Sequence, residues 1–231
     1  YGSLWRELRA AVRGLRARRF DLAIDLQGLL KSALPVWLSG ADERIGLGSR
    51  EGGQRLMTAV IGRGPDRQQI SSEYLHLARA LGWPTDAFRL QLYLSTQAER
   101  DAAALIEAHG LSRGYAVICP FTTRPQKHWM DARCRPLVEQ IQAQFGLRSV
   151  MLGGPGDREA AQRITGESSQ GVEVGHGAPL VNLVGATSLL SAAALIRRAR
   201  LLVAVDTGLG HMGVAFERPT VLLFGSTCPY T

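Results

Sequence analysis

The feature that most constrains this chain is a regular alternation of short apolar runs with helical segments in its second half. Runs such as Tyr115–Cys119 and Leu201–Val205 are almost wholly apolar, as strands buried on both faces are. Strands that alternate with helices of ~10–15 residues form a parallel sheet whose two faces are covered by the helices. We therefore expect an α/β protein with doubly wound, Rossmann-like sheets.

The same pattern gives an element map and a division into domains. We expect strands at 20–25, 44–47, 115–119, 148–152, 172–174, 201–205 and 220–224. Helices are expected at 1–19, 27–39, 73–81, 100–109, from 131 onward, 157–164 and 208–216. A further helix is expected from Thr187, as its N-cap, to Ala199. Residues 48–70 are polar and glycine-rich and are predicted as loop. The stretch 84–96 lacks a period and is predicted as a linker between domains 1–90 and 91–231, both of them incomplete in this sequence.

Charge and cysteine usage narrow the function classes. The chain carries 27 Lys and Arg against 20 Asp and Glu, a net charge of +7. Residues 1–20 hold six arginines and one acid, so +5 of that charge lies in one expected helix. This helix is either a solvated basic face or one that meets an anionic membrane or phosphorylated acceptor. The rest is nearly neutral and lacks an aromatic platform, which argues against a nucleic-acid binder.

Three widely spaced cysteines without a CxxC pair predict neither a disulfide framework nor a zinc site, and they fit a reducing cytosolic compartment. No apolar run approaches the ~18 residues of a membrane span.

Ligands of open α/β sheets bind where strands end and helices begin. After 115–119 come Thr122, Thr123 and Lys127, two hydroxyls and a point charge suited to a phosphate or diphosphate. The alternative is a polar loop, and Trp129 is more simply a core anchor.

Two further strand ends carry glycines and polar side chains. Gly153-Gly-Pro-Gly-Asp157 follows one strand, and Asp157 either caps a helix or accepts ribose hydroxyls. Asp206-Thr207-Gly208-Leu-Gly-His211 follows another, and the amides of Thr207 and Gly208 suit an anion. Asp206 suits a sugar hydroxyl or a loop backbone, and His211 is either packed or a ligand.

In the first domain, Asp25, Gln27 and Lys31 follow a strand and can face one edge of the sheet; the alternative is a capped helix with a solvated lysine. Gly225-Ser-Thr227 adds another polar loop after the last strand.

Four blocks in order resemble glycosyltransferase family 9, the bacterial lipopolysaccharide heptosyltransferases. They are Asp25-Leu-Gln-Gly-Leu-Leu-Lys-Ser32, Thr122-Thr-Arg-Pro-Gln-Lys-His-Trp129, Asp206-Thr-Gly-Leu-Gly-His211 and Phe224-Gly-Ser-Thr-Cys-Pro229. The second and third most resemble the heptosyltransferase I members of the family. Met130 stands where relatives usually have proline.

The resemblance implies a GT-B fold, two Rossmann-like domains facing a cleft, and the donor ADP-L-glycero-D-manno-heptose. It implies that the diphosphate lies at Thr122, Thr123 and Lys127, with Lys127 stabilising the leaving group, the ribose at Asp157 and the adenine near Thr187. It implies further that Asp206, Thr207, Gly208 and His211 line the diphosphate and heptose site, and that Asp25, Gln27 and Lys31 lie on the acceptor side.

The implied reaction inverts the anomeric carbon with neither metal nor cofactor, as a Kdo hydroxyl of a lipid A–Kdo acceptor attacks. It implies work at the cytosolic face of the bacterial inner membrane, with residues 1–19 as a peripheral contact. The resemblance places the catalytic aspartate upstream of Tyr1, so we expect no turnover from these residues alone. The alternatives are heptosyltransferase II, another family member with a different sugar or acceptor, and a non-catalytic nucleotide-sugar binding module.

Overall fold

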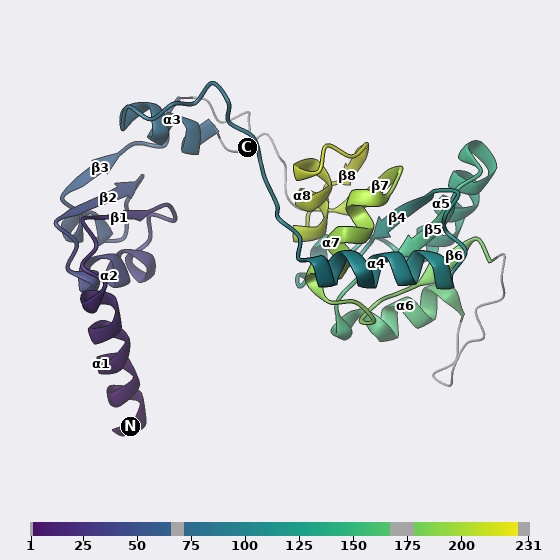
Figure 1. Ribbon diagram of the computed structural model, residues 1–231, viewed down its shortest axis with the longest axis horizontal. Helices are drawn as coiled ribbons and strands as arrows, with labels where there is room; N and C mark the ends of the chain where they lie inside the picture. Colours follow the sequence, from purple (N-terminus) through teal and green to yellow (C-terminus); the bar gives the residue numbers. More distant parts are fainter. Residues whose placement is uncertain (1, 66–71, 167–177, 226–231) are drawn as a thin grey trace. The chain divides into compact units, whose positions relative to one another are not determined.

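The computed structural model describes residues 2–65, 72–166 and 178–225 of the chain. It divides into two compact units, Tyr1–Phe88 and Arg89–Cys228 (Figure 1). We call them unit 1 and unit 2 and describe each by itself.

Unit 1 is built on parallel strands in the order β1 (Leu22–Asp25), β2 (Glu43–Leu47) and β3 (Ala59–Ile61). Helix α2 (Leu30–Ser39) connects β1 to β2, and the short helix η1 (Gly53–Leu56) connects β2 to β3. Helix α3 (Ser72–Ala80) follows. The prediction of loop for 48–70 is wrong where β3 and η1 form, because a three-residue strand leaves no period to detect.

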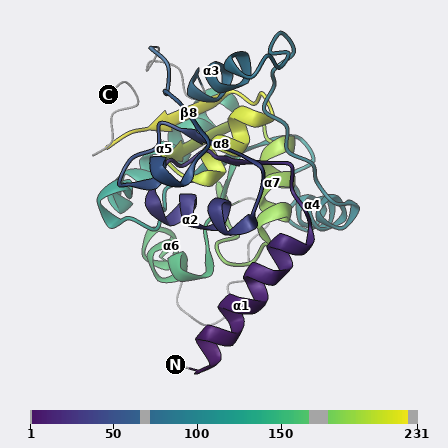
Figure 2. The same ribbon diagram turned by 90° about the vertical axis from the view of Figure 1, so that its left-hand side faces the viewer.

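The basic N-terminal helix is confirmed as α1 (Gly2–Ala17), which extends away from the sheet of unit 1 (Figure 2). The end of α1 is tied to α2, where Arg16 Nε donates to the Leu38 carbonyl at 3.2 Å. Trp5 and Leu8 are 62% and 47% exposed, so the first turns of α1 present both apolar and cationic side chains to solvent.

Unit 2 is a parallel sheet in the order β6-β5-β4-β7-β8. Its strands are β4 (Tyr115–Cys119), β5 (Arg148–Met151), β6 (Leu180–Asn182), β7 (Leu201–Val205) and β8 (Thr220–Leu223). Its helices are α4 (Thr96–Ala108), α5 (Asp131–Phe145), α6 (Arg158–Thr165), α7 (Leu189–Arg198) and α8 (Gly208–Ala215), with short turns η2 (Pro125–Lys127) and η3 (Pro155–Asp157). The doubly wound α/β prediction is confirmed.

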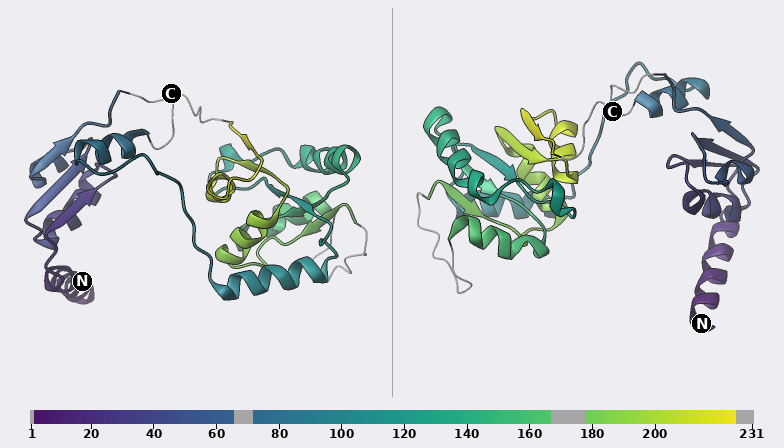
Figure 3. Two further views of the ribbon diagram at one scale, coloured as in Figure 1. Left: turned by 45° about the horizontal axis from the view of Figure 1, so that its top comes forward. Right: turned by 180° about the vertical axis from the view of Figure 1, so that it is seen from behind.

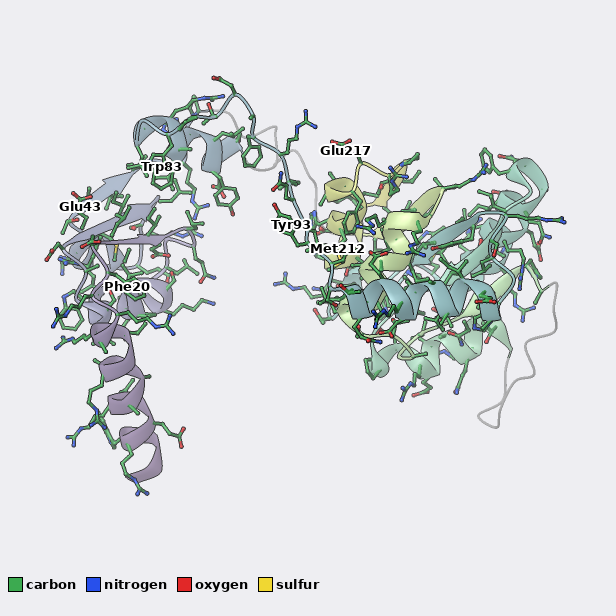
Figure 4. All side chains as sticks on the ribbon, viewed as in Figure 1. Phe20, Glu43, Trp83, Tyr93, Met212 and Glu217 are labelled. Atoms are coloured by element: carbon green, nitrogen blue, oxygen red, sulfur yellow. The ribbon has the colours of Figure 1, made fainter. Side chains whose placement is uncertain are left out.

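Helices cover both faces of this sheet (Figure 3). One apolar cluster joins the strands to α4, α7 and α8, and Met212 of α8, labelled in Figure 4, packs against it. A second cluster lies under α5 and α6 and includes Cys134, Val138 and Ile164. Burial on both faces explains why the strands of unit 2 are continuous apolar runs rather than alternating ones.

The boundaries correct several predictions. Helix α4 begins at Thr96, one turn before the predicted start, because the Ser95 hydroxyl accepts from the Ala98 amide and caps it. The cap of α7 is Ser188, which accepts from the Ser191 amide, and not Thr187. Strand β6 was not predicted. The predicted strand 172–174 lies outside the described residues.

Candidate functional site

The strand order of unit 2 creates a switch point between β4 and β7. The connections from β4 to β5 and from β5 to β6 place α5 and α6 on one face of the sheet. The connections into and out of β7 place α7 and α8 on the other face. The connections diverge at the carboxyl ends of these two neighbouring strands, which is where open α/β sheets bind ligands. The loop after β4 holds Thr122, Thr123 and Lys127, and the loop after β7 holds Asp206 and Thr207.

A cavity of about 690 Å³ lies at this edge of the sheet. Its wall is built from the ends of three strands and the start of two helices. The lining residues are Phe121, Thr122, Thr123, Gly153, Gly154, Pro155, Gly156, Asp157, Thr187, Ser188, Leu189, Ala192, Thr207, Gly208 and Leu209. Hydroxyls and glycine backbone on one part of the wall, with leucine and alanine on another, suit a ligand that has both a phosphate and an apolar ring.

An ion pair joins the two loops beside the cavity. Lys127 Nζ lies 2.6 Å from Asp206 Oδ2, and the side chains are 14% and 22% exposed. The imidazole Nε2 of His211 is 3.6 Å from the other carboxylate oxygen of Asp206. The carboxylate therefore holds the ammonium in place, in loops whose neighbouring residues Thr123 and Thr207 line the cavity.

The loop after β4 is fixed by its own contacts. The His128 Nε2–H donates to the Thr122 carbonyl at 2.5 Å, and the His128 ring meets Phe121 edge-on. The Trp129 amide donates to the Pro120 carbonyl at 3.1 Å, and its side chain packs against the cluster under α5 and α6. Trp129 is therefore the core anchor of the simpler interpretation, and the neighbouring His128 holds the Thr122 carbonyl in position.

In the glycine-rich turn after β5, the side chains of Phe121 and Asp157 lie close to the backbone of Gly153. A Cβ at Gly153 would lie 2.8 Å from Phe121 Cδ2 and 3.1 Å from Asp157 Oδ2. The same carboxylate oxygen of Asp157 accepts from the Gly154 amide at 2.8 Å. Asp157 is the N-cap residue of α6, but its side chain bonds to the loop before it and not to the helix amides. This bond orients the carboxyl group at the cavity wall.

Helix α8 presents its N-terminus at the same wall. Thr207 is its N-cap residue but makes no side-chain bond to the helix amides. The first backbone hydrogen bond of α8 runs from the His211 amide to the Thr207 carbonyl, at 3.2 Å. Amides of the first turn and the positive end of the helix dipole are thus directed toward the cavity, an arrangement that favours an anion.

The two cysteines that the structure describes take no part in this site. Burial raises the pKa of the Cys119 thiol strongly, and burial with the charge of Asp131 raises the pKa of Cys134 to about 11. Both are neutral packing groups near neutral pH. Among the described residues, no cluster of three His, Cys, Asp or Glu side chains has the arrangement of a metal site.

In unit 1, Asp25 lies at the end of β1 and is 3% exposed. Its Oδ1 accepts from the amides of Gln27 and Gly28, each at 3.0 Å. Gly28 has φ +70°, and a Cβ there would lie 2.4 Å from the Leu47 carbonyl oxygen, so this turn requires glycine. The side chains of Gln27 and Lys31 are exposed.

Comparison with known proteins identifies the family. Residues 8–231 match the family model described as glycosyltransferase family 9 (heptosyltransferase). The chain belongs to this family. It is 30% identical over 243 residues to lipopolysaccharide heptosyltransferase 1 of Pseudomonas aeruginosa, a match that covers 98% of this chain and 62% of that relative. The chain thus spans less than two thirds of the length of this relative.

Solved structures of family 9 enzymes have the same fold. E. coli ADP-heptose lipopolysaccharide heptosyltransferase II superposes with a TM-score of 0.74 at 26% identity, covering 97% of this chain and 69% of that one. E. coli heptosyltransferase WaaC with ADP superposes with a TM-score of 0.70 at 27% identity, covering 98% and 69%. The GT-B fold class expected from the sequence is therefore confirmed for this family 9 chain.

The cavity brings together most of the residues that sequence reasoning selected for the donor. Six of them line it: Thr122, Thr123, Asp157, Thr187, Thr207 and Gly208. Lys127, Asp206 and His211 form an adjoining chain of polar contacts. Sequence reasoning missed the apolar wall of Leu189, Ala192 and Leu209, because such residues look like core. Residues 226–229 of the fourth motif lie outside the described part of the chain.

Proposed function

We propose that this family 9 protein transfers L-glycero-D-manno-heptose from ADP-heptose to the Kdo of a lipid A–Kdo acceptor. The observation that carries the proposal is the cavity at the β4–β7 switch point, with Lys127 and the N-terminus of α8 at its edge. The resemblance to WaaC with ADP supports a nucleotide as its occupant.

In this proposal the site residues stabilise the leaving ADP. The hydroxyls of Thr122 and Thr123, the ammonium of Lys127 and the first amides of α8 surround the diphosphate. Charge that develops on the leaving oxygen meets groups already oriented by the contacts with Asp206 and His128. The transfer inverts the anomeric carbon without a metal or a cofactor, since the lysine and the helix end supply the positive charge.

The remaining donor groups have assigned places in the proposal. Asp157 accepts from the ribose hydroxyls, and the adenine lies between Thr187 and the apolar wall near Leu189. Asp206 and His211 lie on the heptose side. Asp25, Gln27 and Lys31 lie on the acceptor side in unit 1. The test is transfer of heptose from ADP-heptose by the full-length protein, with Lys127→Ala expected to lower kcat because the charge on the leaving group is no longer neutralised.

A second candidate changes only the substrates. The identities to heptosyltransferase II and to WaaC are 26% and 27%, so they do not choose between the members of the family. Assays with lipid A–Kdo and with its heptosylated product separate the two candidates. Transfer to the first supports a heptosyltransferase I activity, and transfer to the second alone supports heptosyltransferase II. Binding of ADP-heptose without any turnover supports a binding module.

We propose further that α1 contacts the cytosolic face of the inner membrane. Arg6, Arg9, Arg13 and Arg16 recur at spacings of three and four residues, and the exposed Trp5 and Leu8 accompany them. Anionic headgroups attract such a helix by ~1 kcal/mol per basic residue, and the apolar side chains enter the interface. Among the described residues, no helix is long and apolar enough to cross a membrane.

Sedimentation with phosphatidylglycerol vesicles tests this contact. The double variant Arg9→Glu with Arg13→Glu is expected to lose binding by more than about tenfold. The control reverses two exposed arginines of unit 2, Arg113→Glu with Arg133→Glu. Equal binding by both double variants would contradict a role for α1.

A further inference from the structure

The turn Gln27–Gly28 at the end of β1 is held at every backbone polar group. Both amides donate to Asp25 Oδ1. The Gly28 carbonyl accepts from the Arg50 amide at 2.9 Å, and the Gln27 carbonyl accepts from Arg63 Nη2 at 2.8 Å. Such fixation of the backbone is what a side chain requires when it must be held in a precise direction.

Arg63 is the residue that links this turn to a distant element. Its Nη1 lies 2.5 Å from Glu73 Oε2 in the first turn of α3, with the two side chains 36% and 27% exposed. Its stem crosses Gly48, which has φ +57°, where a Cβ would lie 2.7 Å from Arg63 Cγ. The glycine thus leaves room for the arginine, and one guanidinium joins the turn after β1 to α3.

The residue whose backbone these contacts fix is Gln27. It is exposed, while the backbone around it is immobilised. A carboxamide both donates and accepts hydrogen bonds, so it can read a hydroxyl and a carboxylate of a sugar acid together.

We propose that Arg63 is a positioning residue that aims the Gln27 carboxamide at the acceptor sugar. This rests on the proposed function, in which Gln27 lies on the acceptor side. Arg63 itself touches no substrate and acts through the Gln27 carbonyl, with Glu73 fixing the direction of the guanidinium. Specificity for the acceptor then depends on an arginine 36 residues away in sequence from the side chain it orients.

The test is a double-mutant cycle in the full-length protein with Arg63→Ala, Gln27→Ala and both together. Arg63→Ala is expected to raise the KM for the acceptor by about tenfold, as loss of one charge-assisted hydrogen bond does, with the KM for ADP-heptose changed less than about twofold. In the Gln27→Ala background Arg63→Ala is expected to have little further effect. An undiminished effect there would overturn the proposal.

Arg44→Ala is the matched control, because Arg44 also bonds carbonyls within unit 1, those of Leu56 at 3.0 Å and Ala41 at 2.6 Å, without touching the turn. It should leave the acceptor KM unchanged, and an equal rise in both variants would overturn the proposal as a general loss of stability.

Amide hydrogen exchange at Gln27 and Gly28 supplies a readout independent of transfer. Faster exchange in Arg63→Ala than in Arg44→Ala supports the hold on the turn, and unchanged exchange overturns it. If the wild type transfers to no acceptor, the proposed function fails, and exchange still decides whether Arg63 holds the turn.

Discussion

The position of helix α8, whose N-terminus lines the cavity, depends on Gly213, which lets the helix approach the sheet. A Cβ at Gly213 would lie 2.2 Å from Leu202 Cδ2 and 2.9 Å from Thr220 Oγ1. Leu202 is fully buried in β7, so any shift of its side chain would disturb the core around it. At Gly208, on the same helix, a Cβ would meet nothing within 4 Å. The two positions therefore form a matched pair.

We expect Gly213→Ala to destabilise unit 2 and Gly208→Ala not to. Overpacking costs about 1–3 kcal/mol, and the better helix propensity of alanine returns up to about 1 kcal/mol. The net loss of unfolding free energy for Gly213→Ala is then about 1–2 kcal/mol, or about 4 °C in Tm for each kcal/mol.

The assay is denaturant-dependent hydrogen exchange of the β4 and β7 amides, which reports on unit 2 alone. Equal protection in Gly213→Ala and Gly208→Ala would refute the close packing of α8 on β7.

Three further predictions follow from individual polar side chains and thiols. Asp25→Ala should lower the unfolding free energy by about 2 kcal/mol because one buried and one partly buried amide lose their acceptor, whereas Asp25→Asn keeps an oxygen there and should cost less; denaturant titration compares them. Between pH 9 and 11 the unfolded chain releases thiol protons that the folded protein retains at Cys119 and Cys134, so stability should fall with rising pH by about 1.4 kcal/mol per unit for each thiol. An unchanged slope in Cys134→Ala would contradict this. Ser95→Ala should cost about 1 kcal/mol by uncapping α4, and Thr96→Ala, at the next position, should cost less in the same titration.

Much of unit 2 could be predicted from the sequence because its strands are buried on both faces. Runs such as Tyr115–Cys119 and Leu201–Val205 have no competing interpretation once helices of regular period separate them. Parallel strands end at one edge of a sheet, so the sequence placed the loops of Thr122 and Thr207 at the same edge, where both line the cavity.

The contacts that depend on long-range packing could not be predicted. Lys127 and Asp206 are 79 residues apart, and nothing local pairs them. Strands β3 and β6 have three residues each, too few for a period. Ser188 caps α7 in place of its neighbour Thr187, and both residue types are good N-caps, so the sequence alone does not choose between them.

The central claim, that the cavity of unit 2 binds a nucleoside diphosphate through Lys127, is tested most directly by calorimetric titration of ADP. The protein, Lys127→Ala and the control Arg113→Ala are titrated with ADP and with adenosine, which lacks the phosphates. We expect Lys127→Ala to weaken ADP binding by more than about tenfold and to leave adenosine unchanged, because only the diphosphate meets the ammonium. Arg113 lies before β4, at the opposite end of the strand, and its loss should change neither. Equal ADP affinity in the folded wild type and Lys127→Ala, or no ADP binding by the wild type, would contradict the claim.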